Sequence, residues 1–173
     1  ISAPRVTRTR TSPSVTVHQV VETAAMETMT VVATRLPAAM ETVTVVATRL
    51  PAQDLQRARR FYAEKLGLEP VEERPGGLLY QVAGGEFALF ASAGAPSGEH
   101  TQMGWEVDDL DAVVAALRAR GVVFEEYSLP GMSVVDGIVE VEGNYPSKGG
   151  RGERAVWFHD SEGNLLGIGQ PVR

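Results

Sequence analysis

Two similar stretches of the sequence constrain the fold more than any other feature. Asp54 and Leu55 open the segment DLQRARRFYAEKL, and Asp109 and Leu110 open the segment DLDAVVAALRARG, 55 residues later. In both, an Asp suited to cap a helix precedes apolar residues at helical spacing, and a glycine ends the pattern. Short segments typical of β-strands surround each helix. The sequence therefore predicts an α+β fold in which one small unit occurs twice.

The first unit covers about residues 42–91 and has the order β-α-β-β-β. Residues 42–50 alternate β-branched and small side chains, which predicts a strand, and Pro51 is expected to end it. The helix is expected to run from Asp54 to Gly67. Gly-Gly pairs at the hairpin turns separate three further predicted strands, at residues 69–74, 78–83 and 86–91.

The second unit covers about residues 100–170 and repeats this order. A strand is predicted at residues 101–107, and the helix that follows is expected to end at Gly121. The last three segments with strand character lie at residues 122–127, 155–159 and 164–170. Residues 128–152 are rich in Gly and Pro and are interpreted as an insert with one strand-like stretch.

The first 41 residues differ in composition from the rest. They contain none of the 18 glycines, and the motif METMTVVATRLPA at residues 26–38 recurs as METVTVVATRLPA at residues 40–52. A 14-residue period holds one strand and its turn, which is too short for a repeat architecture. Only the second copy leads into a helix. We therefore interpret residues 1–41 as an extension outside the core and residues 42–173 as a single domain.

Composition excludes several classes of function. The chain has no Cys, so thiolate metal sites and disulfides are absent. No apolar run approaches the about 18 residues that a membrane span needs. The net charge of −6 is opposite to what phosphate contacts require. We therefore expect a cytoplasmic protein with neither a nucleic-acid partner nor a membrane partner.

Three motifs in this order resemble the vicinal oxygen chelate superfamily, which contains glyoxalase I, extradiol dioxygenases and bleomycin-resistance proteins. The motifs are DLQRARRFYAEKLGLEP, MGWEVDDLDAVVAALRARGV and WFHDSEGNLLGI, and the resemblance covers about residues 43–170. It implies two βαβββ modules whose curved mixed sheets surround a cleft. It also implies a homodimer and, for catalytic members, lyase or dioxygenase activity.

The resemblance also implies where a metal would be held. Metal-dependent members carry His in the first strand and before the V-D-D motif, where this chain has Ala47 and Gln102. The Glu of the last hairpin is replaced by Gly167, and the remaining ligand position falls near Phe90. Neither methyl nor glycine donates to a transition metal, and an amide oxygen is a weak ligand. No cofactor is expected at this site.

A non-standard metal site is an alternative. His100, Gln102 and Glu106 share one strand face because side chains repeat every second residue. They could hold a divalent metal with water in the open positions. In that case the protein would be a metal-dependent lyase or dioxygenase with Glu106 as its catalytic residue. Otherwise, the three residues form a polar wall of a binding cleft.

The preferred interpretation is a metal-free protein that binds or sequesters a small organic molecule. Apolar and aromatic side chains with a few polar groups are typical of such sites. A second alternative is a structural or regulatory dimer with a vestigial cleft. Whether the chain is an enzyme stays open. The candidate ligand-binding residues are His100, Gln102, Met103, Trp105, Glu106, Tyr80, Tyr145 and Trp157.

Overall fold

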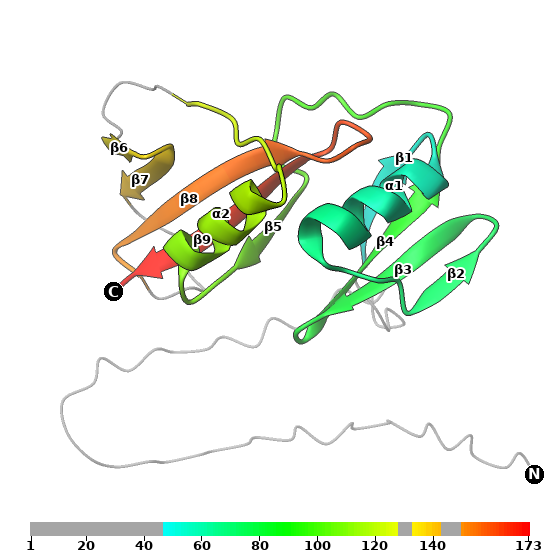
Figure 1. Cartoon of the computed structure of the whole chain (residues 1–173), viewed down its shortest axis with the longest axis horizontal. Helices are drawn as coiled ribbons and strands as arrows, with labels where there is room; N and C mark the ends of the chain where they lie inside the picture. The colour runs from blue at the N-terminus through cyan, green and yellow to red at the C-terminus, as the bar shows by residue number, and fades with distance from the viewer. Residues whose placement is uncertain (1–46, 128–132, 143–149) are drawn as a thin grey trace, which may run out of the picture. The chain divides into compact units, whose positions relative to one another are not determined.

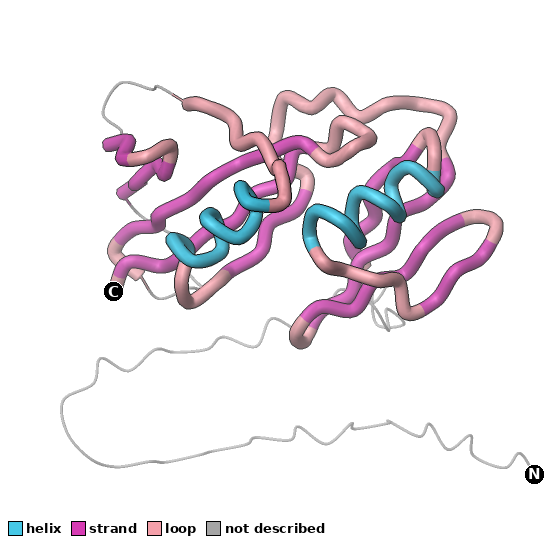
Figure 2. The backbone as a smooth tube through the Cα atoms, in the orientation of Figure 1, coloured by secondary structure: helices cyan, strands magenta, loops and turns pink. Residues whose placement is uncertain are grey.

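A computed structural model describes residues 47–127, 133–142 and 150–173. The three ranges belong to one compact unit, in which two mixed β-sheets each carry a helix on one face (Figure 1). Figure 2 shows the same arrangement as a tube, with the helices in cyan and the strands in magenta. The predicted α+β fold of two modules with curved mixed sheets is confirmed. Residues 1–46, 128–132 and 143–149 lie outside the described part, and with them Tyr145.

The first module contains a four-stranded sheet in the order β1-β4-β3-β2. Strand β1 pairs with β4 in parallel, and the other neighbours are antiparallel. The helix begins after its cap Asp54, changes to π-helical form at Tyr62, and ends at Gly67, whose φ is 71°. The bounds are β1 (Thr48–Ala52), α1 (Leu55–Phe61), η2 (Tyr62–Leu66), β2 (Glu72–Arg74), β3 (Gly77–Val82) and β4 (Gly85–Ala91).

The prediction that Pro51 ends the first strand is wrong. Pro51 lies inside β1, where it is opposite Phe90. Among the described strands, β1 lies at the edge of its sheet with β4 as its neighbour, so the missing N–H of a proline can face away from the sheet at no cost to the ladder. The strand therefore continues for two residues beyond the predicted end, and Leu50 and Ala52 both enter the core.

The second module contains a five-stranded sheet in the order β5-β9-β8-β7-β6. Its first strand pairs in parallel with its last, as in the first module. The helix again begins after an Asp cap, Asp109, which accepts a hydrogen bond from the N–H of Ala112. The bounds are β5 (Met103–Glu106), α2 (Leu110–Ala119), β6 (Ser133–Val135), β7 (Ile138–Glu142), β8 (Gly152–His159) and β9 (Leu165–Val172).

The strand predicted at residues 122–127 forms only in part. Phe124 makes an isolated bridge with Phe158, and the N–H of Glu125 donates to the Trp157 carbonyl at 2.7 Å. The beginning of β8 pairs instead with β7, which belongs to the predicted insert. Along the same side of β8, two separate segments of the chain therefore serve as partners: β7 at the beginning of β8 and the segment around Phe124 near its end. Composition alone gives no signal for such a division, because both segments have strand character.

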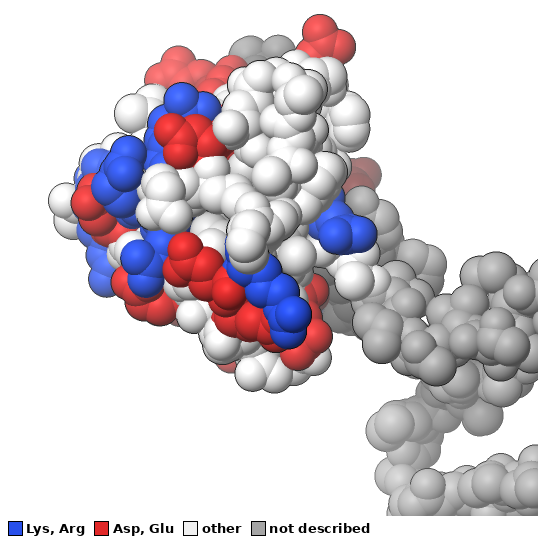
Figure 3. All heavy atoms as spheres, turned by 90° about the vertical axis from the view of Figure 1, so that its right-hand side faces the viewer, with Lys and Arg blue, Asp and Glu red and all other residues white. Residues whose placement is uncertain are grey.

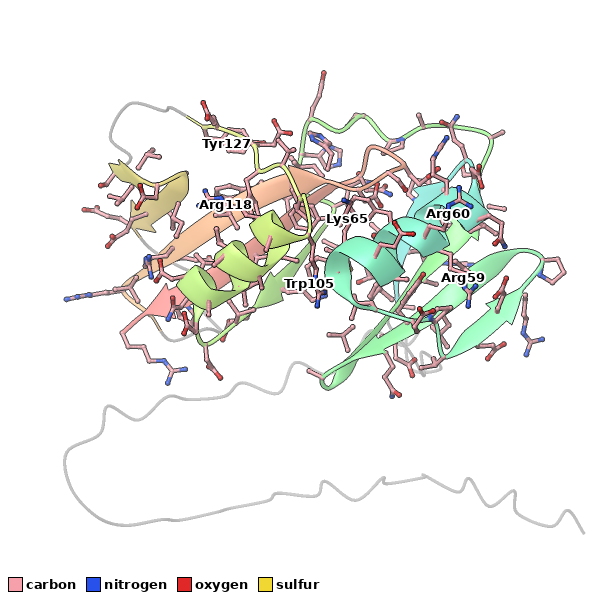
Figure 4. All side chains as sticks on the ribbon, in the orientation of Figure 1. Arg59, Arg60, Lys65, Trp105, Arg118 and Tyr127 are labelled. Carbon is pink, nitrogen blue, oxygen red and sulfur yellow. The ribbon has the colours of Figure 1, made fainter. Side chains whose placement is uncertain are left out.

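The core joins the helices to the sheets, and aromatic rings fill much of it. Tyr80 is fully buried and stacks on Phe87 with ring centroids 4.9 Å apart. Trp105 of β5 meets Phe87 edge-on at 6.0 Å, and Figure 4 shows Trp105 where the two modules come together. Burial raises the pKa of Tyr80 to about 12. Tyr80 therefore belongs to the core of the first module.

The turn between β8 and β9 holds the two modules together. Asp160, Glu162 and Asn164 are buried there. The Glu162 carboxylate accepts hydrogen bonds from the N–H groups of Gln53 at 2.8 Å and Asp54 at 3.0 Å. It also accepts two from the Arg57 guanidinium. Burial raises the pKa of Glu162, but these donors lower it more, and the net shift is downward.

A second part of this junction centres on Asp160. Its carboxylate accepts hydrogen bonds from the Tyr62 hydroxyl at 3.0 Å and from the Asn164 side-chain amide at 2.8 Å. The same amide donates to the Pro51 carbonyl at 3.0 Å. Burial and the nearby Asp160 charge raise the pKa of Tyr62. The hydroxyl therefore stays protonated and remains a donor to Asp160.

The outer surface of the first module mixes charges of both signs. Figure 3 shows Lys and Arg side chains interspersed with Asp and Glu side chains on the face that it presents. Arg59 of α1 illustrates the mixture, because it lies 3.5 Å from Glu69 and 3.7 Å from Glu73. In the part of the chain that the structure describes, no helix is long and apolar enough to cross a membrane.

Candidate functional site

The candidate site is an open pocket of about 550 Å³ on the second sheet. Side chains alternate along a strand, and Leu166 and Ile168 of β9 belong to the core. The intervening Gly167 and Gly169 therefore face the opposite side, where β5, β8 and β9 border the pocket. The pocket lies on the face of this sheet that does not carry the core residues.

Glycines form the floor of the pocket. A Cβ atom at Gly167 would lie 3.2 Å from Nε1 of Trp157, and one at Gly169 would collide with the Glu153 carboxylate. The side chains of Trp157 and Glu153, both on β8, therefore lie over Gly167 and Gly169 of β9, and a larger residue at either glycine would leave them no room. Gly104 of β5 continues this floor opposite Gly167.

An aromatic wall stands at one end of the pocket. The half-buried indole of Trp157 lies over Gly167, and the ring of Tyr127 meets it edge-on at 5.2 Å (Figure 4 labels Tyr127). Aromatic edge-to-face pairs fix the orientation of a ring. The structure thus presents a positioned indole beside the open volume.

The polar groups of the pocket come from β5 and β8. Gln102 precedes β5, and its N–H donates to the Leu165 carbonyl at 2.9 Å. Its side-chain Oε1 is buried and has no hydrogen-bond partner among the described residues. Glu106 is paired with Gly169 in the sheet, and the Glu153 carboxylate lies over the same glycine. Both acidic residues therefore border the part of the pocket at Gly169.

The structure brings some of the sequence-predicted residues together and separates others. Gln102, Met103, Trp105, Glu106 and Trp157 all border the pocket. Met103 and Trp105 also pack against the core, so they contribute less of their side chains to the open volume.

Two other predicted residues lie elsewhere. Tyr80 is in the core of the first module, and His100 is exposed in the segment before β5. There, Nδ1 of His100 lies 3.2 Å from the Ser97 hydroxyl. Neither residue is among those that border the pocket.

Glu153 and the glycine floor of the pocket were not among the residues predicted from the sequence. Glu153, Ala155 and Trp157 alternate along β8 and therefore share the face that borders the pocket. Trp157 was already a candidate, so the same spacing could have identified Glu153. The role of Gly169 could be recognised only from the sheet register, which pairs it with Glu106.

The donor set does not fit the metal site that catalytic members of the resembled superfamily carry. Ala47 and Gly167 offer no donor atom, and Phe90 lies on the other sheet. Within residues 47–127, 133–142 and 150–173, no three His, Asp or Glu side chains are placed to hold a metal together. Of the non-standard set, Gln102 and Glu106 border the pocket and His100 does not.

His159 ties the segment before β5 to the second sheet. Its Nδ1 lies 2.8 Å from a Glu125 carboxylate oxygen, and its Nε2 lies 3.0 Å from the Gly98 carbonyl oxygen. Both partners are acceptors, so only the protonated imidazolium donates to both. Burial lowers the pKa of His159, but the Gly98 and Glu125 contacts raise it more, and the net shift is upward.

Solved structures with this fold come from several bacteria. A glyoxalase/bleomycin resistance protein/dioxygenase from Nocardioides is 23% identical, with a TM-score of 0.53, covering 78% of this chain and 89% of that chain. One from Alicyclobacillus acidocaldarius is 20% identical, with a TM-score of 0.54, covering 75% and 92%. TnmS3, an antibiotic binding protein from Streptomyces sp. CB03234, is 25% identical, with a TM-score of 0.50, covering 76% and 98%.

The family itself follows from the sequence match. Comparison with curated proteins gave no match. The family description "Glyoxalase/Bleomycin resistance protein/Dioxygenase superfamily" matches residues 44–168, which span both modules and include the residues that border the pocket except Gly169. The chain therefore belongs to the glyoxalase/bleomycin resistance protein/dioxygenase superfamily.

Proposed function

We propose that the protein binds a small organic molecule in the pocket of the second sheet, without a metal. The observation that carries this proposal is the pocket itself, in which an indole and a glycine floor leave about 550 Å³ open beside a few polar groups. Volumes of roughly 300–1,000 Å³ with sparse polar groups are typical of small-molecule sites. The antibiotic-binding Streptomyces protein, which has the same fold, supports this class of ligand.

A thermal-shift screen of planar aromatic compounds tests the proposal. A compound that binds only the folded state raises the melting temperature, and at a given concentration a tighter ligand raises it more. Trp157→Ala should weaken any hit by about tenfold or more, because it removes an aromatic contact surface. Phe90→Ala is the control, since Phe90 belongs to the first sheet and borders a different hollow. A library without a hit, or hits that bind Trp157→Ala equally well, would contradict binding in this pocket.

Elemental analysis of the purified protein tests the metal-free part of the proposal. Mn, Fe, Co, Ni, Cu and Zn should be absent, and should remain absent after incubation with each ion and gel filtration. A near-stoichiometric metal would instead favour the lyase or dioxygenase alternative. In that case Glu106→Gln should lower both metal content and turnover, while Glu86→Gln should change neither.

We also propose that the protein acts as a homodimer in the cytoplasm. The pocket is bordered by residues of the second module, and the first sheet carries a separate hollow of about 420 Å³ lined by Arg49, Leu79 and Ala88 among others. A second copy could cover one or both surfaces. Light scattering should give twice the mass of the chain, and cell fractionation should place the protein in the cytoplasmic fraction.

A further inference from the structure

The two ends of the pocket differ in chemistry. At one end, the indole of Trp157 lies over Gly167 and is oriented by Tyr127. At the other end, Glu106 is the partner of Gly169 in the sheet, and the Glu153 carboxylate lies over the same glycine. Among the described residues that border the pocket, these two are the charged ones, and neither Lys nor Arg occurs.

The sheet fixes the separation between the two ends. Gly167 and Gly169 are two residues apart on β9, and two residues of a strand span about 6.8 Å. A molecule that stacks on the indole would therefore bring a group about 7 Å away to the carboxylates. That is the reach of a short flexible arm on a flat ring.

Charge decides which group would be favoured there. A protonated amine donates hydrogen bonds and attracts carboxylates, whereas a carboxylate placed at this end would be repelled. Both Glu106 and Glu153 also interact with other groups of the chain, so a bound cation would share them with those groups. The net charge of −6 further favours the approach of a cation.

Gln102 adds a third requirement. Its buried Oε1 is an acceptor without a partner among the described residues, and leaving such an atom unsatisfied is unfavourable. A ligand that offers an N–H or O–H donor near the aromatic end would satisfy it. A molecule with donors is thus preferred over one that carries acceptors alone.

From these observations we infer that the pocket selects cationic aromatic molecules, in which a flat ring lies against Trp157 and a protonated amine on a short arm reaches Glu106 and Glu153. This inference rests on the proposed function and names its ligand class. It specifies a charge and a separation that neither the fold nor the family match specifies.

Three indoles with the same ring and similar short arms test the inference: tryptamine, which is cationic, tryptophol, which is neutral, and indolepropionate, which is anionic. Isothermal titration near neutral pH should show tryptamine binding about tenfold more tightly than tryptophol, because hydrogen bonds between charged groups are stronger than those between neutral groups. Indolepropionate should bind most weakly. Added salt should reduce the difference, because it screens exposed charges.

Variants distinguish the effect of the two pocket carboxylates on binding from the effect of the net charge of the protein. Glu106→Gln with Glu153→Gln should bring the affinity for tryptamine to that for tryptophol. Glu86→Gln, an exposed change on the first sheet, should leave the preference intact. If the double variant does not fold, each single variant should still remove part of the preference.

The outcomes distinguish this inference from the proposed function. If tryptophol or indolepropionate binds as tightly as tryptamine, the charge preference is wrong, while the pocket remains a small-molecule site. A preference that survives both Glu-to-Gln changes is also contrary to it. If none of the three indoles binds, the inference is overturned, and the thermal-shift screen then decides separately whether the proposed function stands.

Discussion

The Glu162 side chain shows how one buried carboxylate can join two modules. It is fully buried and accepts hydrogen bonds from Gln53, Asp54 and Arg57 of the first module. In Glu162→Gln, an amide N–H₂ replaces one acceptor, so at least one of these donors loses its partner. We expect the free energy of unfolding to fall by about 2 kcal/mol.

Chemical denaturation measures this change. Glu64→Gln is the matched control, because Glu64 is exposed on η2. Its stability should stay within about 0.5 kcal/mol of the parent. Equal stability of the Glu162 variant and the parent would mean that the junction does not depend on this carboxylate.

At the residue scale, the contacts of His159 predict that the stability of the fold depends on pH. Because its pKa is raised in the folded state above the ordinary value of 6.5, the charged form stabilises the fold. This contribution is fully present below the unfolded pKa and is lost as pH rises through the folded pKa. The groups that face the ring are the Glu125 carboxylate, the Gly98 carbonyl and the nearby Asp160 carboxylate.

His159→Gln should therefore lower the melting temperature more at about pH 6 than at about pH 9. Thermal unfolding of both proteins across this range measures the difference. His100→Gln, a change of the exposed histidine, should show a constant difference from the parent. A His159 effect that does not vary with pH would contradict the role of the imidazolium.

At the scale of elements, the two adjacent glycines of the first hairpin, Gly76 and Gly77, differ in whether a side chain would fit. A Cβ atom at Gly77 would lie 2.6 Å from the Leu89 carbonyl oxygen of β4, whereas one at Gly76 would meet nothing within 4 Å. Gly77→Ala should therefore cost about 2 kcal/mol, since backbone must move. Gly76→Ala should be close to neutral by chemical denaturation. Equal losses would show that turn conformation, not this contact, limits the hairpin.

The elements also show where local patterns predict structure and where they do not. The two Asp caps and the Gly67 stop were predictable, because capping depends on neighbouring residues only. Pro51 was misjudged because its tolerance depends on β1 being an edge strand. Along β8, the beginning of the strand pairs with β7 and Phe158 pairs with Phe124, and no local pattern predicts where one partner replaces the other.

At the scale of the whole molecule, the duplicated motif raises the question of which copy builds the core. Leu50 of the second copy is 1% exposed in β1. We propose that residues 1–41 lie outside the core, so that Leu36, its equivalent in the first copy, contributes nothing to stability. Leu50→Ala should cost about 3 kcal/mol, while Leu36→Ala should be neutral.

Thermal unfolding of both variants, and of a chain that begins at Met40, checks this proposal. The shortened chain should melt at the same temperature as the full chain. A loss of stability in Leu36→Ala or in the shortened chain would show that the first copy takes part in the fold.

The sequence by itself determined the two modules, their helices and the superfamily, because caps, periodicity and motif order are properties of neighbouring residues. It also placed Gln102, Glu106 and Trp157 among the candidates for one site. The tertiary structure decided that Tyr80 fills the core, that His100 lies away from the pocket, and that the Glu153 carboxylate lies over Gly169, the partner of Glu106 in the sheet. Those outcomes depend on sheet register, which brings β5, β8 and β9 together across more than 40 residues of chain.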